Sequence, residues 1–259
     1  MSTTTLAAPT RVDTFGVHAR PGLGRLILVE LRKMVDTRAG FWLLAAVAAI
    51  TIAAVVIRAL VGDASDHTFQ SMMFVALQPA SVLLPVVGIL LVTSEWSQRT
   101  GQITFTLTPV RSRVLLAKLL ASVVPAASAL LLCLAVAAAA TALAGADLEG
   151  TWSYSPALLG QAAVYLVAAM VTGVAFGAVL LASAPAILVN FALPTAWVAL
   201  ATLSVFAGLA PWLDPALDGM AEEVLSPAQW AHAGTALALW MVLPLLIGTY
   251  RITRREVSA

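Results

Sequence analysis

Six long apolar stretches dominate this sequence and limit the folds that it can adopt. Each holds about the 20 mostly apolar residues that a helix needs to cross the hydrocarbon core of a bilayer. Backbone groups in lipid must be paired within a helix or a closed barrel, and the period-two alternation of barrel strands is absent from the sequence. The sequence therefore predicts an all-α integral membrane protein with six transmembrane helices, at about 41–60, 73–92, 114–143, 157–183, 186–209 and 232–250.

The amino-acid composition agrees with lipid as the solvent for most of the chain. Of its 259 residues, 61% are hydrophobic and 10% are charged, whereas a soluble domain has about 45–50% apolar and about 25% charged residues. The single cysteine, Cys133, lies inside an apolar stretch, which predicts a small buried hydrophobic residue and no disulfide or thiolate metal site. The three histidines share no close spacing with carboxylates, so no metal site is expected.

The distribution of Lys and Arg predicts the orientation of the spans. All but one of the 14 fall before the first span, in or just after the connection between the second and third, or after the sixth. Arg58, near the outer end of the first span, is the exception and can extend its charge to the interface. The connections on the other side carry Asp and Glu instead. Because positively charged loops stay inside, both termini are predicted to be cytoplasmic, in a multi-pass protein of the plasma membrane.

Segments outside the spans have signatures of their own. Residues 1–21 are predicted to be a polar, poorly ordered cytoplasmic tail, and 22–259 to form one six-span membrane domain. Apolar residues at helical spacing in 23–36, with basic residues around the rest of the wheel, predict a helix that lies in the membrane interface. The alternative is a continuous extension of the first span, which Gly40 disfavours because it offers a break. Residues 211–230 are predicted to form one or two short helices on the outer face.

The chain lacks several motifs of transport and catalysis. No Asp, Glu, Lys or His lies near the middle of a predicted span, which counts against proton-driven transport. No HExxH, paired intramembrane Asp or Ser-His-Asp set is present, so an intramembrane enzyme is not expected. The sequence also has no G-x-x-x-x-G-K-[ST] loop that could hold phosphate. If ATP drives this protein, another chain must bind it.

The segment 94–113, SEWSQRTGQITFTLTPVRSR, is the predicted cytoplasmic connection that is large enough to contact a soluble partner, because the other, near 182–185, is a tight turn. Ser94 is a good N-cap, and a short helix that ends near Pro109 is predicted. The segment could instead be a basic signal that only fixes the topology. Such a signal would need Arg or Lys alone, without the acidic and aromatic residues that this segment also contains.

Motifs in this region resemble a known family. E-W-S-Q-R-T-G (95–101), followed by T-L-T-P-V-R-S-R-V-L-L-A-K (106–118), resembles the region between the second and third spans of ABC-2 type transporter permeases, the membrane subunits of ABC exporters. V-E-L-R-K-M-V-D-T-R (29–38) is similar to the helix that leads into the first span of that family. The resemblance covers roughly 23–250, and the order Thr100-Gly101 is the reverse of the family's commoner one.

The resemblance implies an ABC-2 architecture, similar to that of type V exporters, with a cytoplasmic coupling helix that docks on a separate ATPase subunit. That partner would bind ATP and Mg, and this chain would bind no cofactor. Trp96 would be buried in the partner, the arginines would pair with acidic rims, and Glu95 would stabilise the N-terminal helix or cap locally. Importers of the superfamily dock through a later connection, so the resemblance implies export. The residues implied in coupling are Glu95, Trp96, Arg99, Thr100, Gly101, Pro109, Arg111 and Arg113.

The spans also contain candidates for a transport path and for the pairing of two chains. Six spans with one ATPase make half a transporter, so a second permease chain, identical or different, is expected. Gly173-x-x-x-Gly177 permits close helix contact, either between two chains or within one. Polar residues of the second and fifth spans either line a central path or bond to neighbouring helices; they are Gln78, Ser81, Asn190 and Thr195.

The small number of polar groups in the spans favours an amphipathic or lipid-like substrate for an ATP-driven exporter. Two other functional classes stay open. One is a self-sufficient channel or secondary carrier, and the other is a membrane structural or immunity protein without transport. Of the three, the exporter is the one that explains the composition of segment 94–113.

Overall fold

The structure, a computed structural model, describes residues 22–63, 67–97, 111–144, 150–214, 217 and 219–254. All regular structure in these residues is helical, and six of the helical segments are long and apolar enough to cross a membrane. The predictions of an all-α fold and of six spans are therefore confirmed, and by length and composition the chain is a multi-pass membrane protein. The elements are α1 (Leu23–Asp36), α2 (Arg38–Val61), α3 (Phe69–Ser97), α5 (Arg111–Leu143), α6 (Pro156–Leu180), α7 (Ser183–Ala201), a 3₁₀ turn (Ser204–Phe206), α8 (Ala210–Leu213), α9 (Gly219–Glu222), α10 (Pro227–Leu237), a π-helical segment (Ala238–Val242) and α11 (Leu243–Arg254).

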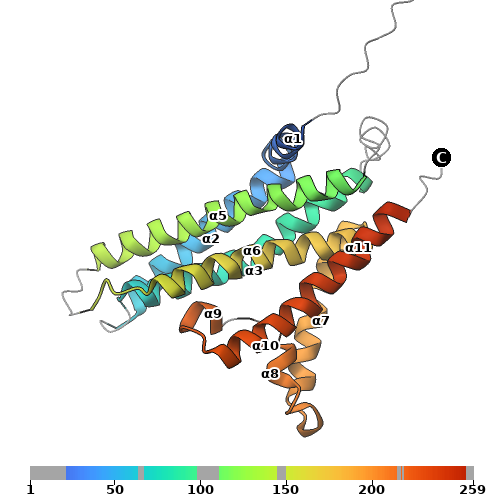
Figure 1. Cartoon of the computed structure of the whole chain (residues 1–259). Coiled ribbons are helices and arrows are strands. Elements are labelled where there is room, and N and C mark those ends of the chain that lie inside the picture. Colours follow the sequence, from blue (N-terminus) through green and yellow to red (C-terminus); the bar gives the residue numbers. More distant parts are fainter. Residues whose placement is uncertain are drawn as a thin grey trace, which may run out of the picture.

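Helices α3 and α6 form the centre of the bundle, with α2 and α5 packed beside them (Figure 1). Glycines let α3 and α6 approach closely. A Cβ on Gly173 of α6 would lie 1.9 Å from the carbonyl oxygen of Pro85, and a Cβ on Gly177 would lie 3.1 Å from that of Ile89. The motif Gly173-x-x-x-Gly177 therefore packs within the chain, and the alternative that it joins two chains is wrong.

Helix α1 lies across one end of the bundle instead of continuing α2 (Figure 1). Thr37 separates the two helices with an extended backbone, φ −83° and ψ 134°, and its hydroxyl accepts a hydrogen bond from the N–H of Gly40 (3.2 Å). The alternative of a continuous first span is therefore wrong, and the break lies at Thr37 rather than at Gly40. Gly40 has another role, because a Cβ there would lie 2.0 Å from the carbonyl oxygen of Met34 where the two helices meet.

Span boundaries differ from the prediction in the C-terminal half. Helix α7 ends at Ala201. Residues 202–209, which were predicted to belong to the span, are as apolar as a span but form turns, one of them a 3₁₀ turn. The last span begins at Pro227, earlier than predicted, because Ser226 and Gln229 form a capping box that starts α10. The predicted spans 41–60, 73–92, 114–143 and 157–183 lie within α2, α3, α5 and α6, apart from the last three residues of the fourth.

The predicted outer segment 211–230 contains the short helices α8 and α9, as expected, although its last residues belong to α10. Helix α9 folds back against α3 and α6, where Met220 is buried. Gln161 of α6 fixes this fold with its side-chain amide. Its Nε2 donates to the carbonyl oxygens of Met220 (3.2 Å) and Glu223 (2.7 Å). Its Oε1 accepts a hydrogen bond from the N–H of Leu225 (3.0 Å).

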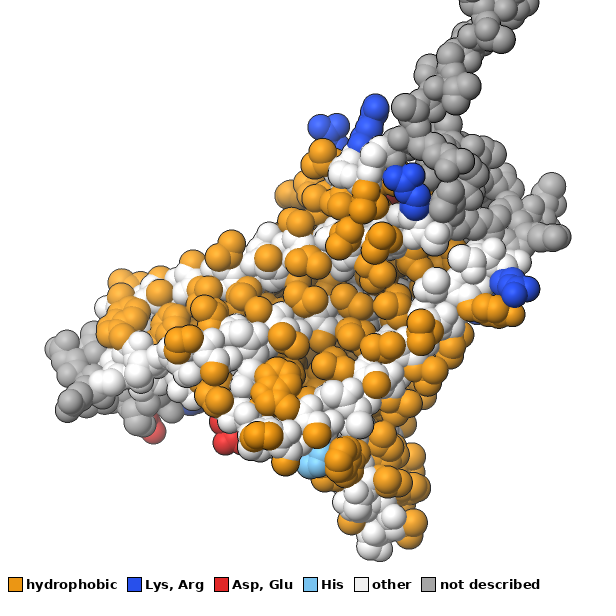
Figure 2. All heavy atoms as spheres, viewed as in Figure 1, with side chains coloured by type: hydrophobic (Ala, Val, Ile, Leu, Met, Phe, Trp, Pro, Cys, Tyr) orange, Lys and Arg blue, Asp and Glu red, His pale blue; other side chains and the backbone are white. Residues whose placement is uncertain are grey.

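Helix α7 and the last span are far less buried than the centre of the bundle. In the most apolar stretch of each helix, 11% is buried in α7 and 17% in the last span, against 56% in both α3 and α6. Figure 1 shows α7 diverging from the bundle, and Figure 2 shows a largely hydrophobic surface over this face of the molecule. Much of the apolar surface of these two spans is therefore free to contact lipid or another chain.

The bundle has two distinct ends. Helix α1, the end of α3, the start of α5 and the end of α11 lie at one of them, which we call the α1 end (Figure 1). Helix α9 packs at the opposite one, near the starts of α3 and α6, which we call the α9 end. The segments that the positive charges assign to one side of the membrane thus share one end of the molecule.

Candidate functional site

Four charged side chains meet at the α1 end, and we call them the charge cluster: Glu30, Lys33, Glu95 and Lys118. They come from three helices, because Glu30 and Lys33 belong to α1, Glu95 to α3 and Lys118 to α5. The Nζ of Lys33 lies 2.8 Å from Glu30 Oε1 and 2.5 Å from Glu95 Oε1. The Nζ of Lys118 lies 2.5 Å from Glu30 Oε2 and 3.3 Å from Glu95 Oε1. Each carboxylate therefore contacts both ammonium groups.

The cluster is buried and electrically neutral. Glu30, Glu95 and Lys118 are 3%, 5% and 4% exposed, and Lys33 is half-buried. Lys118 also donates a hydrogen bond to the carbonyl oxygen of Leu91 in α3 (3.0 Å). Buried charges are tolerated only when they are paired and hydrogen-bonded, and the loss of one partner leaves another without compensation. The cluster therefore holds α1, α3 and α5 together as long as all four members are present.

The electrostatics of the cluster favour the charged form of Lys33. Burial lowers the pKa of the Lys33 ammonium, but the hydrogen bonds and negative charges of Glu30 and Glu95 raise it by more, so that the pKa lies above its usual value. Lys33 therefore stays protonated at neutral pH. Since both carboxylates are already engaged by two cations, the arrangement suits a structural connection better than acid–base chemistry.

Two of these charges, Glu95 and Lys118, lie at the start of the segment 94–113 and just beyond its end. Glu95 lies in the last turn of α3, and Lys118 lies in the second or third turn of α5, so the two helices that flank residues 98–110 each contribute to the cluster. Residues 98–110 themselves lie outside the described residues, and so does the rest of the predicted short helix. Its predicted N-cap, Ser94, is wrong, because α3 continues without a break to Ser97. The cluster thus fixes both helical ends of this connection to α1.

The structure describes only some of the residues that the resemblance implies in coupling. Glu95 contacts α1 through Lys33, which is the contact that its expected stabilising role requires. Arg113 is half-buried in the first turn of α5. Trp96 and Arg111 belong to α3 and α5, but their side chains lie outside the description. Arg99, Thr100, Gly101 and Pro109 lie outside the described residues altogether.

Sequence reasoning named none of the partners of Glu95 as a site residue. One signal was present, because Glu30 shares a flank of α1 with Ile27 and Met34, which pack against the core. A carboxylate among apolar residues of an amphipathic helix needs a buried partner. The sequence offers several Lys and Arg as partners, however, and only the packing of α5 against α1 selects Lys118.

The four polar residues proposed for a transport path lie on two helices, Gln78 and Ser81 on α3, and Asn190 and Thr195 on α7. On α3, Ser81 donates a hydrogen bond to the carbonyl oxygen of Gln78 (2.8 Å) and accepts one from the hydroxyl of Tyr165 in α6 (3.0 Å). On α7, Thr195 is exposed and donates to the carbonyl oxygen of its own helix at Phe191 (2.7 Å), and Asn190 is buried. The contact of Ser81 with Tyr165 supports the alternative in which this residue bonds to a neighbouring helix.

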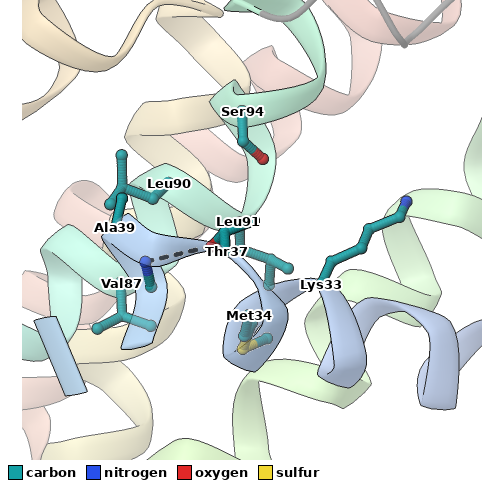
Figure 3. Close-up of a pocket in the computed structure, with 9 residues that line it drawn as sticks. Lys33, Met34, Thr37, Ala39, Val87, Leu90, Leu91 and Ser94 are labelled. Carbon is teal, nitrogen blue, oxygen red and sulfur yellow. Dashed lines mark hydrogen bonds between the residues drawn. The ribbon is translucent and has the colours of Figure 1, made fainter. Parts of the chain in front are cut away.

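A small pocket lies beside the charge cluster (Figure 3). Its volume is about 70 Å³, and it is lined by residues of the α1–α2 junction, among them Met34 and Thr37, and by Val87, Leu91 and Ser94 of α3. The Lys33 ammonium points away from it. Pockets for small organic ligands are larger, at about 300–1,000 Å³. Among the described residues, this pocket is therefore a packed junction of helices that is too small for an organic substrate.

Comparison with known proteins adds no further identification. No protein-family model matches this chain, and no curated protein matches its sequence. The function must therefore be argued from the residues and from the geometry of the α1 end.

Proposed function

We propose that the chain is the membrane-spanning permease subunit of an ABC-2 type exporter in the plasma membrane. It moves an amphipathic or lipid-like substrate outward, driven by a separate ATPase subunit that docks on the segment 94–113. The motifs at 95–101 and 106–118 support this proposal through their resemblance to the family. The observation that carries it is the charge cluster at the two ends of that segment.

A docking segment can transmit motion only if its connections to the spans are stiff. Glu95 and Lys118 lie on the helices that lead into and out of the segment. Both pair with α1, Lys118 with the buried Glu30 and Glu95 with the half-buried Lys33. A displacement of the segment by the ATPase would therefore move α1, α3 and α5 together instead of bending the helix ends. A connection that only fixed the topology would gain nothing from buried charges, because their desolvation is unfavourable.

The proposal requires two further chains. The ATPase subunit supplies the phosphate-binding loop that this sequence lacks, and it binds ATP and Mg. A second permease chain, identical or different, completes the transporter. The low burial of α7 and the last span, 11% and 17% in their most apolar stretches, leaves apolar surface available to that chain.

The test is a reconstituted complex of the chain with a Walker-type ATPase encoded by an adjacent gene. Glu95→Gln keeps the size of the side chain and removes its charge, so α1 should lose its hold on α3. The complex should then lose coupling between ATP hydrolysis and substrate, while the spans stay inserted in the membrane. Coupling free energies between sites are typically worth about 5–150-fold, so we expect stimulated hydrolysis to fall by at least about fivefold.

Glu222→Gln is the matched control, because Glu222 is an exposed carboxylate at the α9 end. It should hydrolyse ATP like the parent. Unchanged coupling in Glu95→Gln would remove the main support of the proposal. ATP hydrolysis by the purified chain alone, after removal of contaminating ATPases, would contradict it directly.

A further inference from the structure

An apolar groove of about 390 Å³ opens on the side of the bundle next to α1. Its lining comes from α1, α2, α3 and α5, and includes Val35, Leu44, Ala48, Val124 and Leu132. The span from Val124 to Leu132 along α5 is about 12 Å long. Among the described residues that line the groove, Ser128 is the one with a polar side chain, and its hydroxyl already donates to the carbonyl oxygen of Val124 (2.9 Å). The groove therefore suits a hydrocarbon chain.

A basic strip borders the groove on the exposed flank of α1. Leu31 and Val35 line the groove. At 100° per residue the exposed Leu28 comes next around the helix, and Arg32 and Arg25, about two turns apart, follow it. Both arginines are exposed, and within Leu23–Asp36 the one exposed carboxylate is Asp36. Figure 2 shows basic side chains beside hydrophobic surface at this end of the molecule. Positive charge thus lies next to an apolar channel, as the two parts of a phospholipid require.

We propose that the groove and the basic strip together bind one anionic phospholipid. An acyl chain occupies the groove, and the phosphate lies against Arg25 and Arg32. An anionic lipid is preferred over a zwitterionic one because each basic residue near an anionic headgroup contributes about 1 kcal/mol. The bound chain fills the space between α1 and α5, whereas the charge cluster lies on a neighbouring flank of α1.

This inference does not depend on the proposed function, since a resident lipid is neither substrate nor ATPase. The full chain in detergent is titrated with phosphatidylglycerol or phosphatidylcholine of identical palmitoyl-oleoyl chains, and the Kd of the first bound lipid is measured by native mass spectrometry. Phosphatidylglycerol should bind more tightly. The double variant Arg25→Gln/Arg32→Gln should weaken it by about 30-fold, or about fivefold per residue, and should weaken phosphatidylcholine, which carries no net charge, much less. Arg254→Gln, an exposed arginine at the same end on α11, is the control and should bind like the parent.

A second pair of variants tests the groove itself. Ala48 lines the groove and the next residue, Ala49, is exposed on another side of α2. Ala48→Phe should weaken binding of both lipids, and Ala49→Phe should not. Dihexanoyl phosphatidylglycerol tests the groove in the parent protein. Its short chains cannot fill the groove, so it should bind far more weakly than the long-chain phosphatidylglycerol. Equal affinity for the two long-chain lipids, an inert arginine pair, or equal binding of the short-chain lipid would each overturn the proposal.

Discussion

The two ends of the bundle are held by different chemistry. At the α1 end, three helices meet through the buried charges of Glu30, Glu95 and Lys118, together with Lys33. At the α9 end, neutral amides do the same task, because Gln161 and Gln70 bond to backbone groups of the outer segment. A buried charge that loses its partner costs about 3–5 kcal/mol, whereas an unpaired neutral group costs about 1–3 kcal/mol. The α1 end is therefore expected to fail as a unit, and the α9 end to loosen one hydrogen bond at a time.

The first prediction concerns the side of the membrane on which each end of the bundle lies. It has the largest expected effect, because a thiol on one side is labelled and a thiol on the other is not. Gly24→Cys at the α1 end should be protected from a membrane-impermeant maleimide added outside intact cells, and Val224→Cys at the α9 end should react. Gly24 has open space around it and Val224 is 51% exposed, so both new thiols are reachable once the reagent is on their side. The parent chain is the blank, because Cys133 is fully buried. The opposite labelling pattern would reverse the predicted topology.

The largest change in stability is expected at the α1 end. Lys118→Met removes one of the two cations that each buried carboxylate contacts, so we expect a loss of about 3–5 kcal/mol in the free energy of unfolding. For a chain of this size the thermal midpoint in detergent should fall by about 10 °C. The double variant Lys118→Met/Glu30→Gln restores neutrality and should recover part of the loss, and Arg254→Met, an exposed cation at the same end, should change little. A midpoint for Lys118→Met equal to that of the parent would show that the cluster contributes nothing to stability.

A smaller effect is expected on the affinity for the ATPase subunit that we propose to bind at the α1 end. Trp96→Ala removes an aromatic side chain from the segment 94–113, and truncation of such a residue in an interface commonly costs about 2 kcal/mol or more. The Kd for the ATPase subunit should therefore rise roughly 30-fold, as measured by titration of the purified subunit. Trp152→Ala at the α9 end is the matched control, since Trp152 is an exposed tryptophan that stacks on Phe69. If both variants bind the ATPase subunit with the same Kd, the two ends do not differ in their contribution to ATPase binding.

The smallest effect is expected at the α9 end. Gln161→Leu removes the hydrogen bonds to Met220, Glu223 and Leu225, and we expect about 1–2 kcal/mol of local stability to be lost. Amides of 219–225 should then exchange with solvent about tenfold faster, whereas those of α1 should be unaffected. Gln70→Leu loses a single bond to Glu222 and should show a smaller increase. Loss of protection throughout the molecule in Gln161→Leu would mean that this end too fails as a unit.

The sequence predicted the spans well because one strong signal decides them. A stretch of about 20 apolar residues has few stable forms in lipid, and 41–60, 73–92 and 114–143 lie entirely within observed helices. The same signal misled where apolar residues form turns, at 202–209, because hydropathy does not distinguish a buried helix from an apolar turn. The helix break at Thr37 was placed at Gly40 because glycine is the commoner breaker, whereas here a side-chain cap on the N–H of Gly40 starts the next helix.

The charge cluster could not be predicted from the sequence for a different reason. Glu95 was singled out by its motif, but the partner of a charge depends on which helices pack together, and hydropathy contains no such information. The position of Glu30 on an apolar flank of α1 predicts a buried cationic partner, but the sequence contains several Lys and Arg that could pair with it. The role of Gln161 could not be predicted, because a single glutamine near the start of a span does not indicate that a later segment will fold against it and accept its hydrogen bonds.

The wide sequence separation within the charge cluster has a consequence for the order of synthesis. Lys33 lies 62 residues before its partner Glu95, and Glu30 lies 88 residues before Lys118. When α1 and α2 leave the ribosome, Glu30 has Lys33 as its neighbour on the same helix, and the remaining partners have not been made. Helix α1 can therefore reach its final place only after two further spans have begun to insert, and until then its charges must stay in water. The end of the molecule that is translated first is thus completed only once the third span is being made.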